Sequence, residues 1–248
     1  MITDARATPS PLSPLSAAVR NNALWCDAVC RSHGVPGAVE GDVWASALRT
    51  PPLYPDAVTL SPAATPDDVL SRIDLSSPGA SVKDSFGSLD LSAAGFEVLF
   101  EARWIHRAAT DPAPPPRADR WGPVEGAARL LAWEAAWSGD GESGGLFRPA
   151  LLDDGAVFLA PTGTDPAGTA PVTAGAIAYP GASVIGISNL FAADGDLDAA
   201  WRGCLRATDR LWPGVPVVGY EHGDDLAAAE RQGFTPVGPL RVWLRTEA

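Results

Sequence analysis

A tyrosine, a glutamate and a histidine stand together as Tyr220, Glu221 and His222. They lie at the end of a short apolar segment, residues 215–221, that its β-branched pattern predicts to be a strand. If burial raises the pKa of Glu221, its carboxylate is suited to take a proton from an amine. The alternative is a solvated glutamate and a surface histidine beside the turn residue Gly223. These three residues are the candidate catalytic group.

A second polar residue, Asn189, interrupts the apolar segment 183–191. A polar side chain within an apolar strand must find a hydrogen-bond partner. Asn189 is therefore either part of a β-bulge or a residue that faces a ligand, and the sequence leaves both interpretations open.

Other catalytic and metal-binding patterns are missing from the sequence. No Gly-x-Ser-x-Gly elbow surrounds Ser188, and no phosphate loop follows a predicted strand. Cys26, Cys30 and Cys204 have neither the paired spacing of a zinc site nor the even number of a disulfide framework. We expect buried, inert thiols and no metal.

Proline-rich stretches divide the chain of 248 residues into two parts. Residues 1–15 are rich in Pro, Ser and Thr and predict a disordered tail. Residues 111–119, which include the run Pro114-Pro115-Pro116, predict a stiff linker. We therefore expect a first domain over residues 16–110 and a second over residues 120–248.

The two parts end in the same order of elements. Each shows a short strand, a short helix, a Gly-Phe pair and a closing strand. In the first part these four elements lie at residues 80–86, 89–94, 95–96 and 97–105. In the second part they lie at residues 215–221, 224–232, 233–234 and 235–244. Upstream, a strand at 57–60 and a helix at 66–73 parallel a strand at 183–191 and a helix at 197–211. This recurrence predicts a duplication, with Trp104 and Trp243 buried at equivalent positions of the closing strands.

This order of elements resembles the C-terminal half of the GNAT acyltransferase superfamily. The resemblance covers residues 120–246, with a weaker partial copy at 20–106. It implies an α/β (α+β) fold of tandem GNAT-like units, a partial N-terminal copy and a fuller C-terminal copy, with mixed central sheets flanked by helices. It also implies that acyl-CoA binds at the end of the fourth strand, here at Asn189, Leu190 and Phe191.

Two signatures of that superfamily are absent. Its phosphate-binding loop reads Arg/Gln-x-x-Gly-x-Gly/Ala, whereas residues 192–198 contain one glycine and the three aspartates Asp194, Asp196 and Asp198. Acyl-CoA is thus the implied cofactor without its usual phosphate loop. The tyrosine that often protonates the leaving thiolate is replaced by Ala229, which leaves Tyr220, Glu221 and His222 as the nearby candidates.

These features favour an acyltransferase that moves an acyl group from a thioester to a small amine or amino acid. The alternatives are a tandem-GNAT enzyme that takes aminoacyl groups from tRNA, and a binding protein that has lost catalysis. The net charge of −12, with Lys83 as the single lysine, makes nucleic-acid binding unfavourable. No apolar run of transmembrane length and no signal-peptide pattern is present, so we expect a cytoplasmic protein without membrane contact.

Overall fold

A computed structural model describes residues 12–76, 78–111, 120–139, 144–162 and 170–246. Helix α1 begins at Pro14, just inside the segment expected to be a tail, and Ser13 caps it by accepting a hydrogen bond from the backbone N–H of Ser16. Residues 1–11 of that tail and all of the proposed linker except Asp111 lie outside the described residues.

The described residues form eleven strands and six α-helices. The strands are β1 (Ala38–Glu40), β2 (Val43–Ala45), β3 (Ala57–Thr59), β4 (Ser81–Asp84), β5 (Phe96–Arg107), β6 (Trp121–Pro123), β7 (Val157–Pro161), β8 (Ala174–Gly181), β9 (Val184–Ala192), β10 (Val217–Glu221) and β11 (Thr235–Arg245). The helices are α1 (Pro14–Ser32), α2 (Pro66–Leu70), α3 (Ala127–Ser138), α4 (Ala150–Asp153), α5 (Leu197–Leu211) and α6 (Gly223–Arg231).

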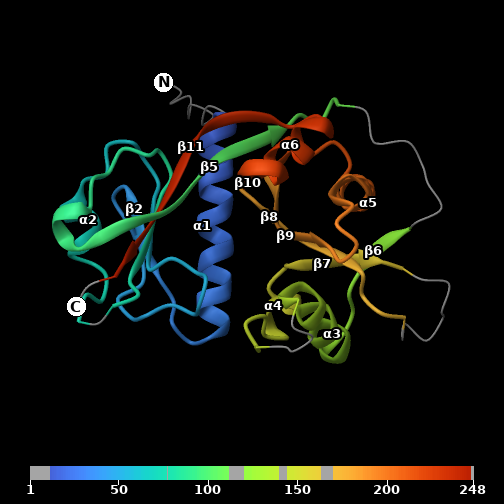
Figure 1. Ribbon diagram of the computed structural model, residues 1–248, viewed down its shortest axis with the longest axis horizontal. Helices are drawn as coiled ribbons and strands as arrows, with labels where there is room; N and C mark the ends of the chain where they lie inside the picture. The colour runs from blue at the N-terminus through green and yellow to red at the C-terminus, as the bar shows by residue number, and fades with distance from the viewer. Residues whose placement is uncertain (1–11, 77, 112–119, 140–143, 163–169, 247–248) are drawn as a thin grey trace, which may run out of the picture.

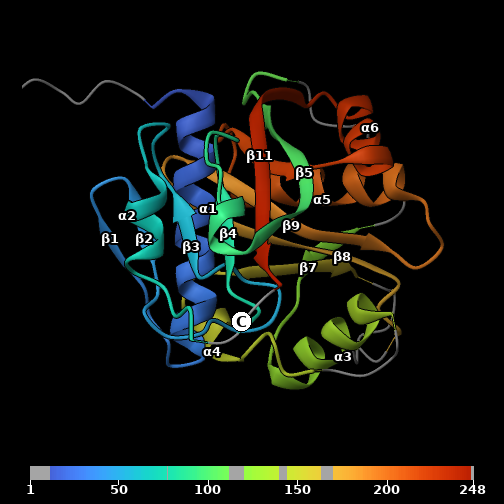
Figure 2. The same cartoon turned by 60° about the vertical axis from the view of Figure 1, so that its left-hand side comes forward.

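All eleven strands belong to one mixed sheet, in the order β1-β2-β3-β4-β11-β5-β10-β9-β8-β7-β6. The expectation of mixed central sheets, one in each unit, was therefore wrong in the number of sheets. Strand β5, from the first part of the chain, pairs with β10, and β11, from the second part, pairs with β4. Figures 1 and 2 show β5 and β11 crossing side by side at the centre of the molecule. The closing strand of each part of the chain thus pairs with a strand of the other part within this one sheet.

The central β5–β11 pair is regular except at two bulges. Ala102 lies opposite Leu240, and each of these residues follows its Gly-Phe pair at the same distance along the chain. The ladder skips Leu99 on β5 and Val237 on β11, which also occupy matching places after their Gly-Phe pairs. A bulge adds one unpaired residue and increases the local twist, so both strands twist at corresponding points.

Both tryptophans of the closing strands are buried, as expected, but they are not equivalent. Trp104 lies opposite Gly238, whereas Trp243 lies opposite Val98. Trp104 packs in a core with α1, and Trp243 packs with α2 and β2 to β4. When Arg103 is aligned with Arg241, Trp104 matches Val242, and Trp243 stands one residue further along its strand. Because successive strand residues point to opposite faces of a sheet, the two indoles lie on opposite faces.

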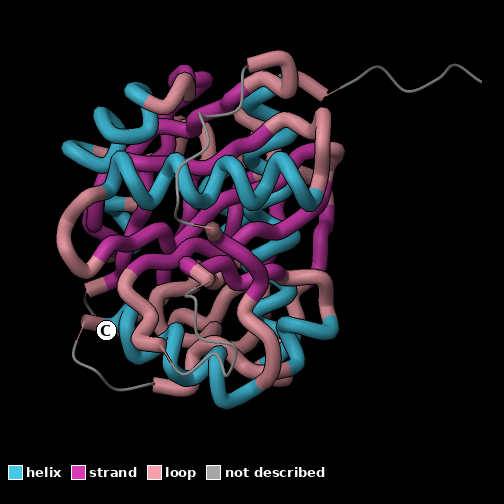
Figure 3. Tube along the Cα trace, turned by 90° about the vertical axis from the view of Figure 1, so that its right-hand side faces the viewer, coloured by secondary structure: helices cyan, strands magenta, loops and turns pink. Residues whose placement is uncertain are grey.

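Helices cover both faces of the strand layer (Figure 3). On one face, α1, α3 and α4 share a core of aromatic side chains in which Trp133 packs edge-on against Phe147 and Phe158. On the other face, α5 and α6 cover the second part of the sheet, with Trp201 against Phe234, and α2 covers the first part. The sheet is therefore held between two helical layers.

The helix expected at 89–94 is only a 3-10 turn, Ser92–Ala94. The carboxylate of Asp84 accepts hydrogen bonds from the backbone N–H groups of Phe86 and Leu89 and holds the chain in a loop up to that point. Gly95, at φ 78°, then ends the turn, so too few residues remain for an α-helix.

Within the described ranges, no helix is both long enough and apolar enough to cross a lipid bilayer.

Candidate active site

The parallel strands β9 and β10 separate soon after they meet. They pair only at Ile185 with Val217 and at Gly186 with Val218. At the next position β10 carries Gly219, where a Cβ atom would lie 2.9 Å from the carbonyl oxygen of Ile187. Glycine permits this close approach, and beyond it the strands run apart. Their diverging ends carry the residues that the sequence selected.

Glu221 lines a cavity of about 280 Å³ beyond the end of β10. Its side chain is half-buried, and burial together with the nearby Asp225 raises its pKa from 4.5 to about 8. His222 and Leu226 line the same cavity from the start of α6. A carboxyl group that exchanges its proton near pH 8 is suited to general acid–base chemistry.

Three charged side chains from β5 and β11 complete this cavity. Arg241 on β11 donates to Glu101 on β5 at 2.6 Å, so these two charges neutralise one another. Arg103 stands opposite Glu221 in the β5–β10 register, yet in the described part of the chain neither makes an ion pair. The cavity therefore holds an unpaired guanidinium and an unpaired carboxyl group from adjacent strands.

Tyr220 lies on the opposite face of the sheet from Glu221, because successive strand residues alternate. Its ring packs edge-on against Trp104, with centroids 5.5 Å apart, in the core beneath α1. It does not line the cavity of Glu221. The structure thus brings Glu221 and His222 together and separates Tyr220 from them.

His222 is exposed at the start of α6 and stacks obliquely on Phe100, with ring centroids 5.7 Å apart. Its side chain does not cap the helix. It remains a candidate because it lines the cavity beside Glu221.

Sequence reasoning missed the surroundings of Lys83. This single lysine of the chain is buried, and its ammonium group donates to the Asn22 side-chain oxygen at 2.8 Å and lies 4.5 Å from the Tyr220 ring centroid. None of the described carboxylates pairs with it. The single lysine of the chain, within the predicted strand 80–86, was the available signal.

Asn189 occupies a β-bulge. Its φ is 53°, and two β9 residues, Asn189 and Leu190, face the single residue Ala176 of β8. Leu190 packs toward the α5–α6 core, while Phe191 packs edge-on against Trp133 at 5.3 Å. Leu190 and Phe191 thus pack into cores on opposite faces of the sheet. Only the backbone and the side chain of Asn189 are left to contact a ligand at this point.

The loop between β9 and α5 uses its own carboxylates as caps. Asp196 accepts from the N–H of Ala199 at 2.8 Å, and Asp194 accepts from the N–H of Asp196 at 3.0 Å. Asp198 pairs with Arg231 at 3.0 Å. Two of the backbone donors that a pyrophosphate would use at this helix N-terminus are thus already engaged by carboxylates, and this loop does not fit the phosphates of CoA.

Ala229, which stands where the GNAT superfamily often has a tyrosine, has no group that could protonate a leaving thiolate. Ala229 is fully buried in the core between α5, α6 and β10, against residues such as Ala228 and Phe234. A phenol at this place would have no free space without repacking.

Comparisons with known proteins identify the architecture. No protein-family model matches the sequence, and no curated protein is significantly similar to it. Among solved structures, a GCN5-related N-acetyltransferase from Kribbella flavida matches with a TM-score of 0.59 at 15% identity, covering 93% of this chain and 96% of that one. A putative acetyltransferase of the GNAT family from Novosphingobium aromaticivorans matches with a TM-score of 0.57 at 13% identity, covering 95% and 100%. The chain therefore has the fold of GNAT acetyltransferases over most of its length.

Proposed function

We propose that the protein is an acyltransferase of the GNAT type that moves an acyl group from a thioester to a small amine or amino acid. The observation that carries this proposal is the Glu221 carboxyl group, with its pKa raised to about 8, in a cavity that the end of β10 and the start of α6 form with β5 and β11. The likeness to acetyltransferases shows only the fold; the reaction is inferred from this site.

In the proposed reaction Glu221 acts as the general base. Its carboxylate takes a proton from the acceptor nitrogen while that nitrogen bonds to the acyl carbon, and the sulfur leaves as a thiolate. Arg103, unpaired on the neighbouring strand, supplies a positive charge that an amino-acid carboxylate can contact. With alanine at position 229, the thiolate leaves without an acid from α6.

The donor is proposed to be held by its thioester end rather than by phosphates. Asp194 and Asp196 accept backbone N–H groups at the α5 N-terminus and place negative charge there, and Asp198 beside them pairs with Arg231. A pyrophosphate placed there would be repelled, so a thioester that lacks the nucleotide loses little. This distinguishes the chain from a conventional CoA-dependent relative.

Thiol release tests the proposal. Purified protein is incubated with acetyl-CoA or acetyl-pantetheine and a panel of amines and amino acids, and free thiol is measured. We expect comparable turnover with both donors and a loss of at least about 100-fold in Glu221→Gln, the scale of a general base. Glu230→Gln, an exposed glutamate on α6, is the matched control and should keep full activity.

A second candidate is a GNAT-like binding protein without catalysis. The occupied α5 N-terminus and the buried Ala229 favour it, because both catalytic signatures are lost together. In that case no donor and acceptor pair releases thiol above the uncatalysed rate, and Glu221→Gln does not differ from the unmodified protein.

We also propose that the two parts of the chain are GNAT-like repeats. The support is the symmetric β5–β11 register, with bulges at Leu99 and Val237 and a centre at Ala102 and Leu240. The near-complete coverage of both chains in the structural matches is consistent with a shared two-part arrangement. Crystal coordinates in which residues 57–107 fail to superpose on 184–245 would refute the duplication.

A further inference from the structure

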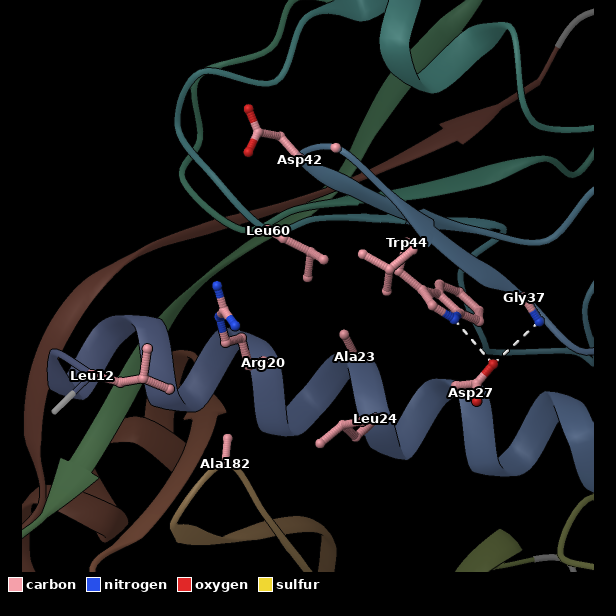
Figure 4. Close-up of a pocket in the computed structure, with 12 residues that line it drawn as sticks. Leu12, Arg20, Ala23, Leu24, Asp27, Gly37, Asp42, Trp44, Leu60 and Ala182 are labelled. Atoms are coloured by element: carbon pink, nitrogen blue, oxygen red, sulfur yellow. Dashed lines mark hydrogen bonds between the residues drawn. The ribbon is translucent and has the colours of Figure 1, made fainter. Parts of the chain in front are cut away.

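A second cavity, of about 510 Å³, lies along α1 and shares no lining residue with the cavity of Glu221. Figure 4 shows α1 on one side, and the β1–β2 hairpin with Leu60 on the other. Its walls include Ala23 and Leu24 from α1 and Trp44 from β2. This volume lies within the range of small-molecule sites, which are mostly apolar with a few placed polar groups.

One wall of this cavity is fixed by Asp27. Its carboxylate accepts hydrogen bonds from the indole N–H of Trp44 at 3.0 Å and from the backbone N–H of Gly37 at 3.2 Å (Figure 4). It also forms an ion pair with Arg31. These contacts tie α1 to the β1–β2 hairpin and hold Trp44 in place. Asp27 is therefore part of the wall and has little capacity left for a ligand.

Two other charged groups of the cavity have no partner in the described ranges. Arg20 projects from α1 and Asp42 from the turn between β1 and β2, and both side chains are exposed. They do not pair with one another or with any other described residue. Figure 4 shows them on opposite sides of the cavity with Leu60 between them. The site thus offers one positive and one negative charge, held apart across an apolar surface.

Apolar side chains beside these charges are exposed to an unusual degree. Leu24 is 46% exposed and Val39 is 60% exposed. Together with the partly buried Leu60 they form an apolar surface that a ligand could cover, and the buried Trp44 lies in the same wall. Covering such a surface is favourable in proportion to the apolar area removed from water.

We propose that this cavity binds a zwitterionic α-amino acid with an apolar side chain. Its carboxylate contacts Arg20, its ammonium group contacts Asp42, and its side chain covers the apolar wall around Leu60 and Trp44. A simple carboxylate would meet Asp42 and the net charge of −12, and a simple amine would meet Arg20. A zwitterion satisfies both charges at once, and the site stands whether or not Glu221 catalyses acyl transfer.

Calorimetric titration with L-phenylalanine tests this site, using the full chain. The comparison ligands are phenethylamine, which lacks the carboxylate, 3-phenylpropionate, which lacks the ammonium group, and glycine, which lacks the apolar side chain. We expect L-phenylalanine to bind and each comparison ligand to bind at least about tenfold more weakly, since each loses one charge-assisted contact or the apolar contact. Equal binding of phenethylamine or 3-phenylpropionate, or no binding of L-phenylalanine, overturns the proposal.

Variants locate the binding in this cavity. Arg20→Gln and Asp42→Asn alter exposed side chains without partners among the described residues, so both are expected to fold. Each should weaken L-phenylalanine binding by about tenfold or more, while Arg148→Gln, an exposed arginine outside the cavity, should leave it unchanged. Binding that survives both substitutions, or that Arg148→Gln weakens equally, contradicts the assignment.

Discussion

Asp84 and Glu221 hold matching places in the two parts of the molecule but differ in their surroundings. Each ends a strand and stands opposite an arginine of a closing strand, Arg241 for Asp84 and Arg103 for Glu221. Asp84 is fully buried, and its carboxylate accepts two backbone hydrogen bonds. Glu221 is half-buried, makes none that the structure records, and faces a cavity.

The two strand pairs that contain these residues, β3 with β4 and β9 with β10, also differ in how closely their ends are held together. In the first part, the Thr59 hydroxyl accepts from the N–H of Ser85 at 2.8 Å and ties the ends of β3 and β4 together. In the second part, β9 and β10 separate after Gly186 and Val218. The ends of β3 and β4 are therefore joined by a side-chain hydrogen bond, whereas the ends of β9 and β10 are apart. With the function proposed for Glu221, one arrangement would serve stability in the first part and chemistry in the second.

The largest effects are expected from the tryptophans that anchor the two parts. Trp104 and Trp243 are both buried, in separate cores. Replacing either with alanine should cost about 3–5 kcal/mol of unfolding free energy, measured by denaturant melts. A loss below about 1 kcal/mol for one of them would mean that its part of the sheet is not held by that core.

The matched pair Asp84→Asn and Glu221→Gln tests the comparison directly. In Asp84→Asn the amide NH₂ cannot accept the hydrogen bond that the lost oxygen received, so we expect a loss of about 2–3 kcal/mol at pH 7. Glu221→Gln should instead stabilise the protein by about 1 kcal/mol at pH 7, because glutamine avoids the cost of keeping a proton that the unfolded chain releases near pH 4.5. Similar losses for the two variants in urea melts would remove the distinction.

The raised pKa of Glu221 also predicts a dependence of stability on pH. The folded protein keeps this proton up to about pH 8, whereas the unfolded chain releases it near pH 4.5, so stability falls as the pH rises through that window. Because the group is only half-buried, we expect a contribution of about 2 kcal/mol. Melts from pH 5 to 9 should show a smaller fall in Glu221→Gln than in Glu230→Gln.

The smallest effect concerns acetyl-CoA. We expect weak binding by the unmodified protein, and a gain of about tenfold when Asp194, Asp196 and Asp198 all become asparagine. Asparagine is also a good helix cap, so the loop should keep its shape. Micromolar binding to the unmodified protein that these substitutions do not change, measured by calorimetry, would contradict this view of α5.

Local pattern was enough to predict most elements of the second part. The helix at 197–211 has the predicted bounds, and β11 extends one residue beyond the expected strand. The single sheet was not predictable, because β5 and β11 pair with residues far away in the chain. Hydrophobic periodicity describes each strand but not its neighbour.

The candidate site was predicted in part. Glu221 and His222 line one cavity, but alternation along β10 turns Tyr220 to the other face, which the strand assignment alone could have shown. The contact of Lys83 with Asn22 joins segments distant in sequence, and the cavity between α1 and β2 depends on the packing of a helix on a hairpin. No local pattern carries such information.

The account depends most on the protonation of Glu221, which carbon-13 NMR of labelled glutamate side chains can measure directly. With Glu221→Gln used to assign the signal, we predict that this carboxyl group titrates near pH 8. A titration of Glu221 near pH 4.5 would contradict the account, because its carboxylate would then be an ordinary solvated group.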